Sequence, residues 1–225
     1  MDSFKVITID GPAASGKSTI ACKLARKLGF VHVNSGALYR ALAVIAVENG
    51  ASLEDDETLA NLARNTSFCF KLQGDGSTKF FVDGEEFSKR IGSEEVARQA
   101  SRIAVLPEVR EVLSEVQRDV AKQGSVVVEG RDAGTVVFAK ASHKFYLDAS
   151  LEVRARRRER EAAENKVVTL EGVRAELRER DHRDSTREIA PQRAARDAVV
   201  VDTSDLGIDE VVNSLYETIA HGEGG

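Results

Sequence analysis

The stretch Gly11-Pro12-Ala13-Ala14-Ser15-Gly16-Lys17-Ser18 decides the fold class of this chain of 225 residues. It fits the pattern G-x-x-x-x-G-K-[ST], in which the glycines let the backbone curl so that its N–H groups point inward at phosphate oxygens. In this pattern Lys17 can reach the outer phosphates of a nucleoside triphosphate, and the hydroxyl of Ser18 can bind Mg²⁺. The residues expected to bind the triphosphate are Gly11, Pro12, Ala13, Ala14, Ser15, Gly16, Lys17, Ser18 and Thr19.

The residues on either side of this loop predict a strand before it and a helix after it. The β-branched run over residues 4–9 is typical of a buried strand. Apolar residues at helical spacing predict a helix over 17–28 that ends at Gly29. A phosphate loop joins such a strand to a helix whose N-terminal end is partially positive, so a chance match in a glycine-rich turn is a poor explanation.

Strands and helices alternate along most of the chain. The further strands are expected at 31–33, 67–72, 79–82, 125–129, 144–147 and 198–201, and the further helices at 36–49, 93–104, 107–122, 151–164, 170–183 and 208–220. This order predicts an α/β fold, a doubly wound parallel sheet flanked by helices, in a single domain over 1–225. The turn Gln73-Gly74-Asp75-Gly76 predicts a hairpin that interrupts the alternation, which indicates a small β-containing insert.

Composition excludes several classes of protein. Lys and Arg total 32 and Asp and Glu total 37, so a net charge of −5 argues against the broad basic face of a nucleic-acid binder. No apolar run approaches the roughly 20 residues that span a bilayer, and the first residues lack the layout of a signal peptide. Cys22 and Cys69 have no C-x-x-C spacing, and we expect both to be buried thiols. The expectation is a cytoplasmic monomer without a membrane partner.

The remaining motifs favour a small-molecule kinase. The guanine-reading string Asn-Lys-x-Asp is missing, and the strand at 125–129 ends in one acid, Glu129, rather than the paired acids of motor ATPases. A kinase needs positive groups that hold an anionic acceptor in line with the γ-phosphate. Arg40, Arg131 and the charged run over 180–187 are candidates.

Most charged residues of the segment 151–196 have a simpler explanation. The segment holds 12 arginines and 1 lysine against 10 carboxylates, a net charge of +3. Solvated helices with i,i+4 ion pairs such as Glu152 with Arg156 account for most of them. That explanation is weaker for Arg40 and Arg131, which stand alone at the ends of expected strands or loops.

The chain resembles bacterial cytidylate kinases over nearly its whole length. The string that begins at Glu129 and contains Arg131 distinguishes this family, because adenylate and guanylate kinases do not carry it. The matching strings, in the family's order, are Ile7-Thr8-Ile9-Asp10-Gly11-Pro12 with the phosphate loop, Ser35-Gly36-Ala37-Leu38-Tyr39-Arg40, Glu129-Gly130-Arg131-Asp132-Ala133-Gly134-Thr135-Val136-Val137-Phe138, Tyr146-Leu147-Asp148-Ala149-Ser150, and Arg180-Asp181-x-x-Asp184-Ser185-x-Arg187-x-x-x-Pro191.

The resemblance implies that ATP and CMP or dCMP give ADP and CDP or dCDP, with Mg²⁺. It implies a P-loop kinase fold with a monophosphate-binding insert at about 66–106 and a helical lid at about 151–168. The residues implied in catalysis are Lys17, Arg131, Arg180 and Arg187. Those implied in binding CMP are Ser35, Arg40, Ser101, Arg110, Arg131, Asp132, Arg180, Asp184 and Arg187, and Arg154 and Arg158 of the lid would join the ATP site.

The hydrogen-bonding groups of cytosine agree with the residues that the resemblance implies around the nucleobase. Cytosine offers an amino donor that a carboxylate such as Asp132 can accept, and acceptors to which Arg110 can donate. Uracil reverses that pattern, and a site of buried polar groups rejects a ligand that leaves them unpaired. Three positions depart from the family pattern. Asn34 replaces a frequent Asp, Ala139 replaces a common Pro with only a loop effect expected, and Ala14 replaces a frequent Gly, a mild change if its φ is ordinary.

Two alternatives stay open at this point. One is a UMP/CMP kinase of the adenylate kinase type, which relative rates with CMP and UMP would separate. The other is a nucleotide-dependent binding switch that uses residues 151–196 as an interaction face. The four histidines, His32, His143, His182 and His221, form no metal-binding cluster, and we expect them to be structural or solvated.

Overall fold

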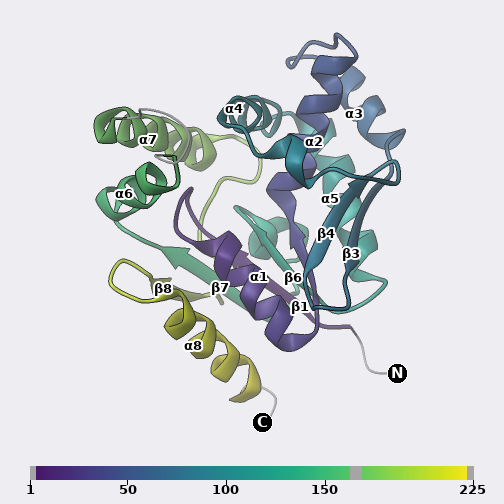
Figure 1. Ribbon diagram of the computed structural model, residues 1–225. Helices are drawn as coiled ribbons and strands as arrows, with labels where there is room; N and C mark the ends of the chain where they lie inside the picture. The colour runs from purple at the N-terminus through teal and green to yellow at the C-terminus, as the bar shows by residue number, and fades with distance from the viewer. Residues whose placement is uncertain (1–3, 163–168, 222–225) are drawn as a thin grey trace.

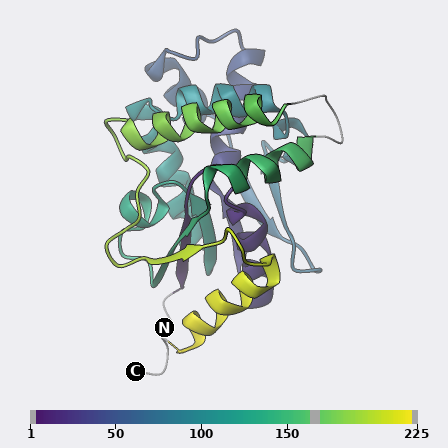
Figure 2. The ribbon, with the colours of Figure 1, turned by 90° about the vertical axis from the view of Figure 1, so that its left-hand side faces the viewer.

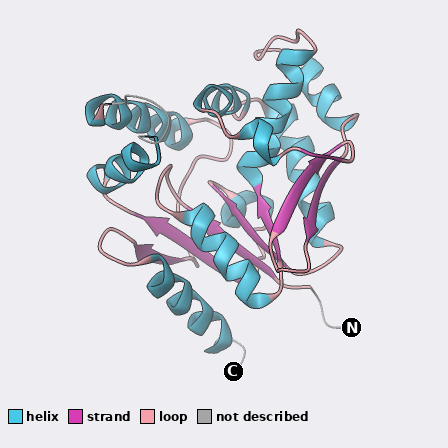
Figure 3. Ribbon diagram, viewed as in Figure 1, coloured by secondary structure: helices cyan, strands magenta, loops and turns pink. Residues whose placement is uncertain are grey.

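The computed structural model describes residues 4–162 and 169–221 (Figure 1). Its centre is a parallel sheet of five strands, coloured magenta in Figure 3, in the order β2-β6-β1-β7-β8. The strands are β1 (Val6–Asp10), β2 (Val31–Asn34), β6 (Val126–Gly130), β7 (His143–Asp148) and β8 (Val199–Asp202). The strands β1 and β6 are buried at nearly every position, as expected for strands covered on both faces.

Helices cover both faces of this sheet, which confirms the predicted doubly wound α/β fold. On one face, α1 (Lys17–Leu28) and α8 (Ile208–His221) pack on Ile7, Ile9 and Val127. On the other face, α2 (Ser35–Glu48), α3 (Asp56–Arg64) and α5 (Pro107–Ala121) share a core with Val126 and Val128. The side chains of successive residues of β6 therefore pack into the cores on opposite faces of the sheet.

A second, antiparallel sheet of three strands follows α3. Its strands are β3 (Phe68–Leu72), β4 (Thr78–Val82) and β5 (Glu85–Glu86). The predicted hairpin is confirmed: Phe68 pairs with Val82 and Leu72 with Thr78, and Gly76 takes a φ of +79° in the turn. A 3₁₀ turn η1 (Ser88–Ile91) and α4 (Glu94–Ile103) lead from this sheet to α5.

Two helices rich in arginine lie over the carboxyl ends of the sheet. They are α6 (Leu151–Ala162) and α7 (Leu170–Thr186), which Figure 2 shows one above the other. Ala155, Val173 and Leu177 bury against Ala13 of the phosphate loop. Residues 163–168, the end of the expected lid, lie outside the described residues.

Two sequence expectations about local structure were wrong or incomplete. Cys22 is exposed and Cys69 is half-buried, and both are free thiols. Cys22 lies off the stripe of α1 that packs on the sheet, which runs through Ile20, Ala21, Leu24 and Ala25. The helix α3 and the π-helical turn η2 (Ala133–Val137) were not predicted, because α3 is short and η2 is held by a distant carboxylate.

No helix among the described residues is long and apolar enough to cross a membrane.

Candidate active site

The phosphate loop runs from the end of β1 into α1 and needs glycine at both ends. A Cβ on Gly11 would lie 2.1 Å from the carbonyl oxygen of Leu147, so no side chain fits there. Gly16 caps α1 with a φ of +87°. Ala14 has a φ of +58°, so the condition under which its replacement of glycine would be mild is not met. A left-handed residue with a Cβ costs about 1–2 kcal/mol, strain that the loop tolerates at this position.

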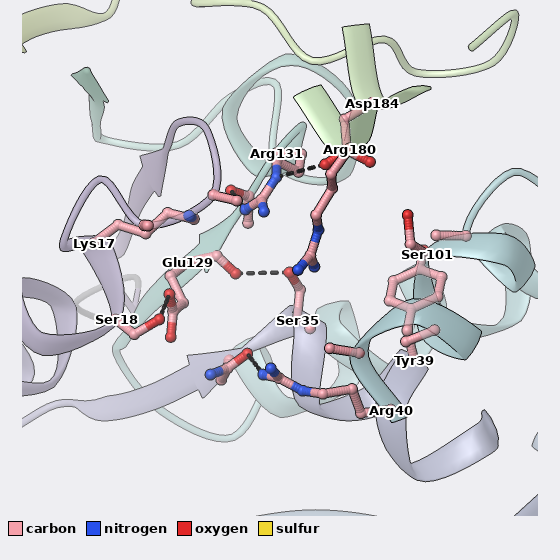
Figure 4. Close-up of a pocket in the computed structure, with 18 of the residues that line it drawn as sticks. Lys17, Ser18, Ser35, Tyr39, Arg40, Ser101, Glu129, Arg131, Arg180 and Asp184 are labelled. Carbon is pink, nitrogen blue, oxygen red and sulfur yellow. Dashed lines mark hydrogen bonds and ion pairs between the residues drawn. The ribbon is translucent and has the colours of Figure 1, made fainter. Parts of the chain in front are cut away.

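Lys17 and Ser18 open α1 and face the cavity (Figure 4). Lys17 Nζ donates to the carbonyl oxygen of Pro12 at 2.7 Å. Burial and the charge of Arg131 hold the Lys17 pKa well below its ordinary value, which an arriving phosphate would reverse. Ser18 Oγ donates to Glu129 Oε2 at 2.5 Å, which leaves its lone pairs available for a cation.

A cavity of about 320 Å³ lies between this loop, α2, α4 and the helices α6 and α7. It brings together most of the residues that the sequence singles out: Ala13, Ala14, Gly16, Lys17, Ser18, Thr19, Ser35, Arg40, Ser101, Arg110, Arg131, Asp132, Arg158, Arg180, Asp184 and Arg187. Gly11, Pro12, Ser15 and Arg154 do not line it. The first three of these shape the loop from behind.

Arg154 is buried against the outer side of the phosphate loop. Its Nε donates to the carbonyl oxygen of Ala149 at 2.9 Å, and its Nη1 donates to that of Ala13 at 3.1 Å. The same Nη1 pairs with Asp181 of α7 at 2.6 Å. With these contacts, Arg154 supports the loop and joins it to α7.

Cations outnumber carboxylates around the cavity. Arg180 and Arg40 have no carboxylate within ion-pair distance among the described residues, and the Nε of each has no hydrogen-bond partner there. Burial, followed by repulsion from Arg131, lowers the Arg180 pKa to about 10. The cationic residues of the lining are Lys17, Arg40, Arg110, Arg131, Arg158, Arg180 and Arg187, against the acids Glu129, Asp132, Glu161 and Asp184. Buried charges of one sign are stable only with a counterion, so the cavity is built for an anion.

The other arginines are held in place by carboxylates. Arg131 Nε donates to Asp184 at 2.9 Å (Figure 4). Asp132 accepts from Arg110 at 2.5 Å on one oxygen and from Arg187 at 2.9 Å on the other. Such charge-assisted bonds orient the guanidinium planes before a ligand arrives.

Two helices reach across the cavity to α4. Arg183 Nη1 of α7 donates to Ser101 Oγ at 2.8 Å, and Arg158 of α6 lies 3.5 Å from Glu94. These contacts cover the cavity from the side opposite the sheet, where they can limit the access of water.

Several residues of the site were given no functional role from the sequence. Tyr39 lines the cavity from α2, and burial raises its pKa. Asn34, at the departure from the family pattern, caps α2 by accepting from the N–H of Ala37 at 3.0 Å. Glu129 was noticed only as the acid that ends a strand, a position that could have marked it, because strand ends carry ligand groups in this fold class.

A magnesium ion would fit here together with a triphosphate. No group of three His, Cys, Asp or Glu side chains that could hold a metal occurs in the described part of the chain. Mg²⁺ is commonly bound through one or two protein groups plus phosphates and waters. The Ser18 hydroxyl, with its proton directed to Glu129, suits that mode.

Comparisons with known proteins agree with this geometry. The family model for cytidylate kinase matches residues 7–221. A cytidylate kinase from Methylococcus capsulatus is 46% identical over 219 residues, covering 97% of this chain and 98% of that one. One from Carboxydothermus hydrogenoformans is 44% identical, covering 95% and 96%. A solved structure of an uncharacterized protein from Eubacterium ventriosum has a TM-score of 0.56 at 12% identity, covering 96% of this chain and 98% of that one, a likeness of fold alone. The chain belongs to the cytidylate kinase family, and is therefore a nucleoside monophosphate kinase.

Proposed function

We propose that the cavity binds ATP on the phosphate loop and CMP or dCMP beside it, and that the γ-phosphate passes directly to the monophosphate. The single observation that carries this proposal is the meeting of Lys17, on the loop, with the uncompensated Arg40 and Arg180 in one cavity. ADP and CDP or dCDP are the products.

Three arginines hold the phosphate of CMP. These are Arg40, Arg131 and Arg187, which come from α2, the end of β6 and the end of α7. Guanidinium groups bind the oxygens of a phosphate in pairs, so a doubly charged group needs several of them. Arg180 lies nearer the transferring group, and Ser35 and Asp184 lie along the ribose.

Three residues read cytosine. Asp132 retains lone pairs for the exocyclic amino group even while it accepts from Arg110 and Arg187. Arg110 and Ser101 offer further polar contacts on the same side of the cavity. Uracil has a carbonyl oxygen where cytosine has the amino group, so two acceptors would face each other at Asp132, which disfavours UMP.

The transfer is in line and has no phosphoenzyme. Lys17 and the loop amides neutralise the leaving phosphates, while Arg131, Arg180 and Arg158 stabilise the charge that develops on the moving group. Mg²⁺, which the Ser18 hydroxyl would help to hold together with the triphosphate, would supply further charge neutralisation. The part of the proposed lid that the structure describes, α6, excludes water, which limits wasteful hydrolysis.

The enzyme is proposed to act as a cytoplasmic monomer, with the insert at about 66–106 forming one wall of the monophosphate site. Ala97, Ala100 and Ser101 of this insert line the cavity. The free state of Cys22 and Cys69 suits a reducing compartment.

A coupled assay of ADP formation tests the proposal, with ATP and either CMP, dCMP, UMP or AMP. We expect rapid turnover with CMP and dCMP and, by discrimination of roughly 10⁴ at best, slow turnover with UMP. Equal rates with UMP would support the UMP/CMP kinase alternative. ADP formation at the same rate with and without a nucleoside monophosphate would reject the proposal.

A further inference from the structure

His32 forms an ion pair with Glu129 on the side of Glu129 that faces away from the nucleotide cavity. Its Nε2 lies 3.2 Å from Glu129 Oε1, and the exposed fractions of the two side chains are 14% and 3%. His32 does not line the cavity, so it is not placed to touch a nucleotide. Its backbone N–H donates to Thr78 Oγ1 at 3.0 Å, which ties β2 to the second sheet.

The fold brings two polar side chains at the edge of α1 close to two polar side chains of the sheet. Ser18 and Cys22 are four residues apart and so lie on neighbouring turns of one side of the helix. In the parallel pair of β2 and β6, His32 stands opposite Val127, two residues before Glu129. Since side chains alternate along a strand, His32 and Glu129 share the sheet face that α1 covers.

Both oxygens of Glu129 are engaged in this arrangement. Oε1 faces His32, and Oε2 accepts the hydroxyl proton of Ser18 at 2.5 Å. A serine hydroxyl has one proton, so donation to Glu129 directs the lone pairs of Ser18 elsewhere. Ser18 lines the cavity beside Lys17, where those lone pairs can meet a cation.

We propose that His32 is a positioning residue for the metal–nucleotide complex: it holds Glu129 so that Ser18 presents its lone pairs to the Mg²⁺ of MgATP. This inference depends on the proposed function, because it takes MgATP as the ligand of the phosphate loop. His32 acts through Glu129 and Ser18.

The charges of the pair agree with this role. Burial alone would lower the His32 pKa, but hydrogen bonds to Cys22 and Glu129 outweigh it and raise the pKa to about 9. Burial alone would raise the Glu129 pKa, and the hydrogen bond and charge of His32 outweigh it and lower that pKa. Glu129 is therefore an ionised acceptor at neutral pH. A protonated Glu129 could donate to Ser18 and turn the serine proton toward the metal.

The test compares His32→Leu, which has no donor, with His32→Gln, whose amide can donate to Glu129. Calorimetry measures ATP affinity with CMP absent, once in EDTA and once in Mg²⁺. Losing a partner of a metal-site residue typically costs 10- to 100-fold in metal affinity. The quantity compared is the ratio of ATP affinity in Mg²⁺ to ATP affinity in EDTA. We expect this ratio to be about tenfold smaller in His32→Leu than in the wild type, and close to the wild-type ratio in His32→Gln. In steady-state assays His32→Leu should need more Mg²⁺, while KM for CMP stays at the wild-type value.

Controls separate this inference from a folding defect and from the proposed function. His221→Leu, on the exposed end of α8, should change nothing. Ser18→Ala should remove the Mg²⁺-dependent gain; if it does not, the proposed role of Ser18 fails. If Ser18→Ala removes the gain and His32→Leu keeps it, only the role of His32 is rejected.

A measurement on the unaltered protein covers the case in which His32→Leu does not fold. In ¹⁵N-histidine spectra, the His32 ring resonances should shift when MgADP binds and stay nearly still when ADP binds in EDTA. Equal shifts in both conditions, or none in either, would overturn the proposal.

Discussion

Asp10 Oδ1 accepts a hydrogen bond from the backbone N–H of Ala133 at 2.9 Å, although the two residues are 123 positions apart in the chain. Its other oxygen accepts from the N–H of Gly134 at 2.7 Å. Asp10 ends β1 just before the phosphate loop, and the residues it holds directly follow Arg131 and Asp132. One buried carboxylate thus joins the loop proposed for ATP to the turn proposed for CMP.

The substitution Asp10→Asn tests this connection. An asparagine can offer one oxygen, but its amide nitrogen would face the second N–H, so the turn should move. A Cβ on Gly134 would lie 2.7 Å from Thr8 Oγ1, which shows how closely the turn is packed here. We expect KM for CMP to rise about tenfold, the effect of about 1.4 kcal/mol, with a smaller change in KM for ATP. Initial rates at varied CMP and varied ATP measure both. An unchanged KM for CMP in a folded variant would contradict the connection.

Lys17→Ala should reduce kcat sharply, by at least about 10²-fold, because a buried cation at the transferred phosphates is lost. The assay is ADP formation with saturating ATP and CMP. Lys23→Ala is a matched control, since Lys23 lies on the same helix but is exposed and pairs with Asp209. Wild-type kcat in Lys17→Ala would reject the role of the phosphate loop.

Asp132→Asn should impair the use of CMP more than the binding of ATP. The amide can donate to a uracil carbonyl, so the preference for CMP over UMP in kcat/KM should shrink, by roughly 1–3 kcal/mol or about 5- to 150-fold. Asp209→Asn, at an exposed position of α8, is the control. Equal losses for ATP and CMP would remove Asp132 from base recognition.

Arg154→Ala should destabilise the fold as well as weaken ATP binding, since Arg154 supports the phosphate loop from outside the cavity. Truncation leaves Asp181 and two carbonyl oxygens without this donor, and we expect a loss of roughly 1–3 kcal/mol in the free energy of unfolding. Urea denaturation measures it, with the exposed Arg156→Ala as the control. A fully stable Arg154→Ala that fails only to bind ATP would indicate direct contact with the nucleotide.

The free energy of unfolding should depend on pH through His32. Its pKa rises from 6.5 to about 9 on folding, so the folded protein holds a proton there that the unfolded chain releases. The stabilisation is complete below about pH 6.5 and is lost as the pH rises through 9, by up to about 3 kcal/mol. Urea denaturation at pH 6.5 and pH 9.5 should show a smaller decline in His32→Gln than in the wild type. Parallel declines would contradict the raised pKa.

The sequence alone determined the elements whose causes are local. The helix α1 has the predicted bounds of 17–28, because glycines and apolar spacing mark both its ends. The hairpin of β3 and β4 follows from its turn residues, and the alternation of strands and helices led to the parallel sheet. The motif strings also led to most of the cavity lining, since the ends of parallel strands meet at one edge.

Only the tertiary structure decided how those residues act on one another. The position of Arg154 behind the loop, the hold of Asp10 on Ala133, and the pair of His32 with Glu129 each join segments distant in sequence. The exposure of Cys22 likewise depended on which stripe of α1 meets the sheet. Local patterns predict which backbone forms, because propensity and turn chemistry act over a few residues. Burial, ion pairing and pKa depend on neighbours that folding brings together, and a linear pattern does not specify them.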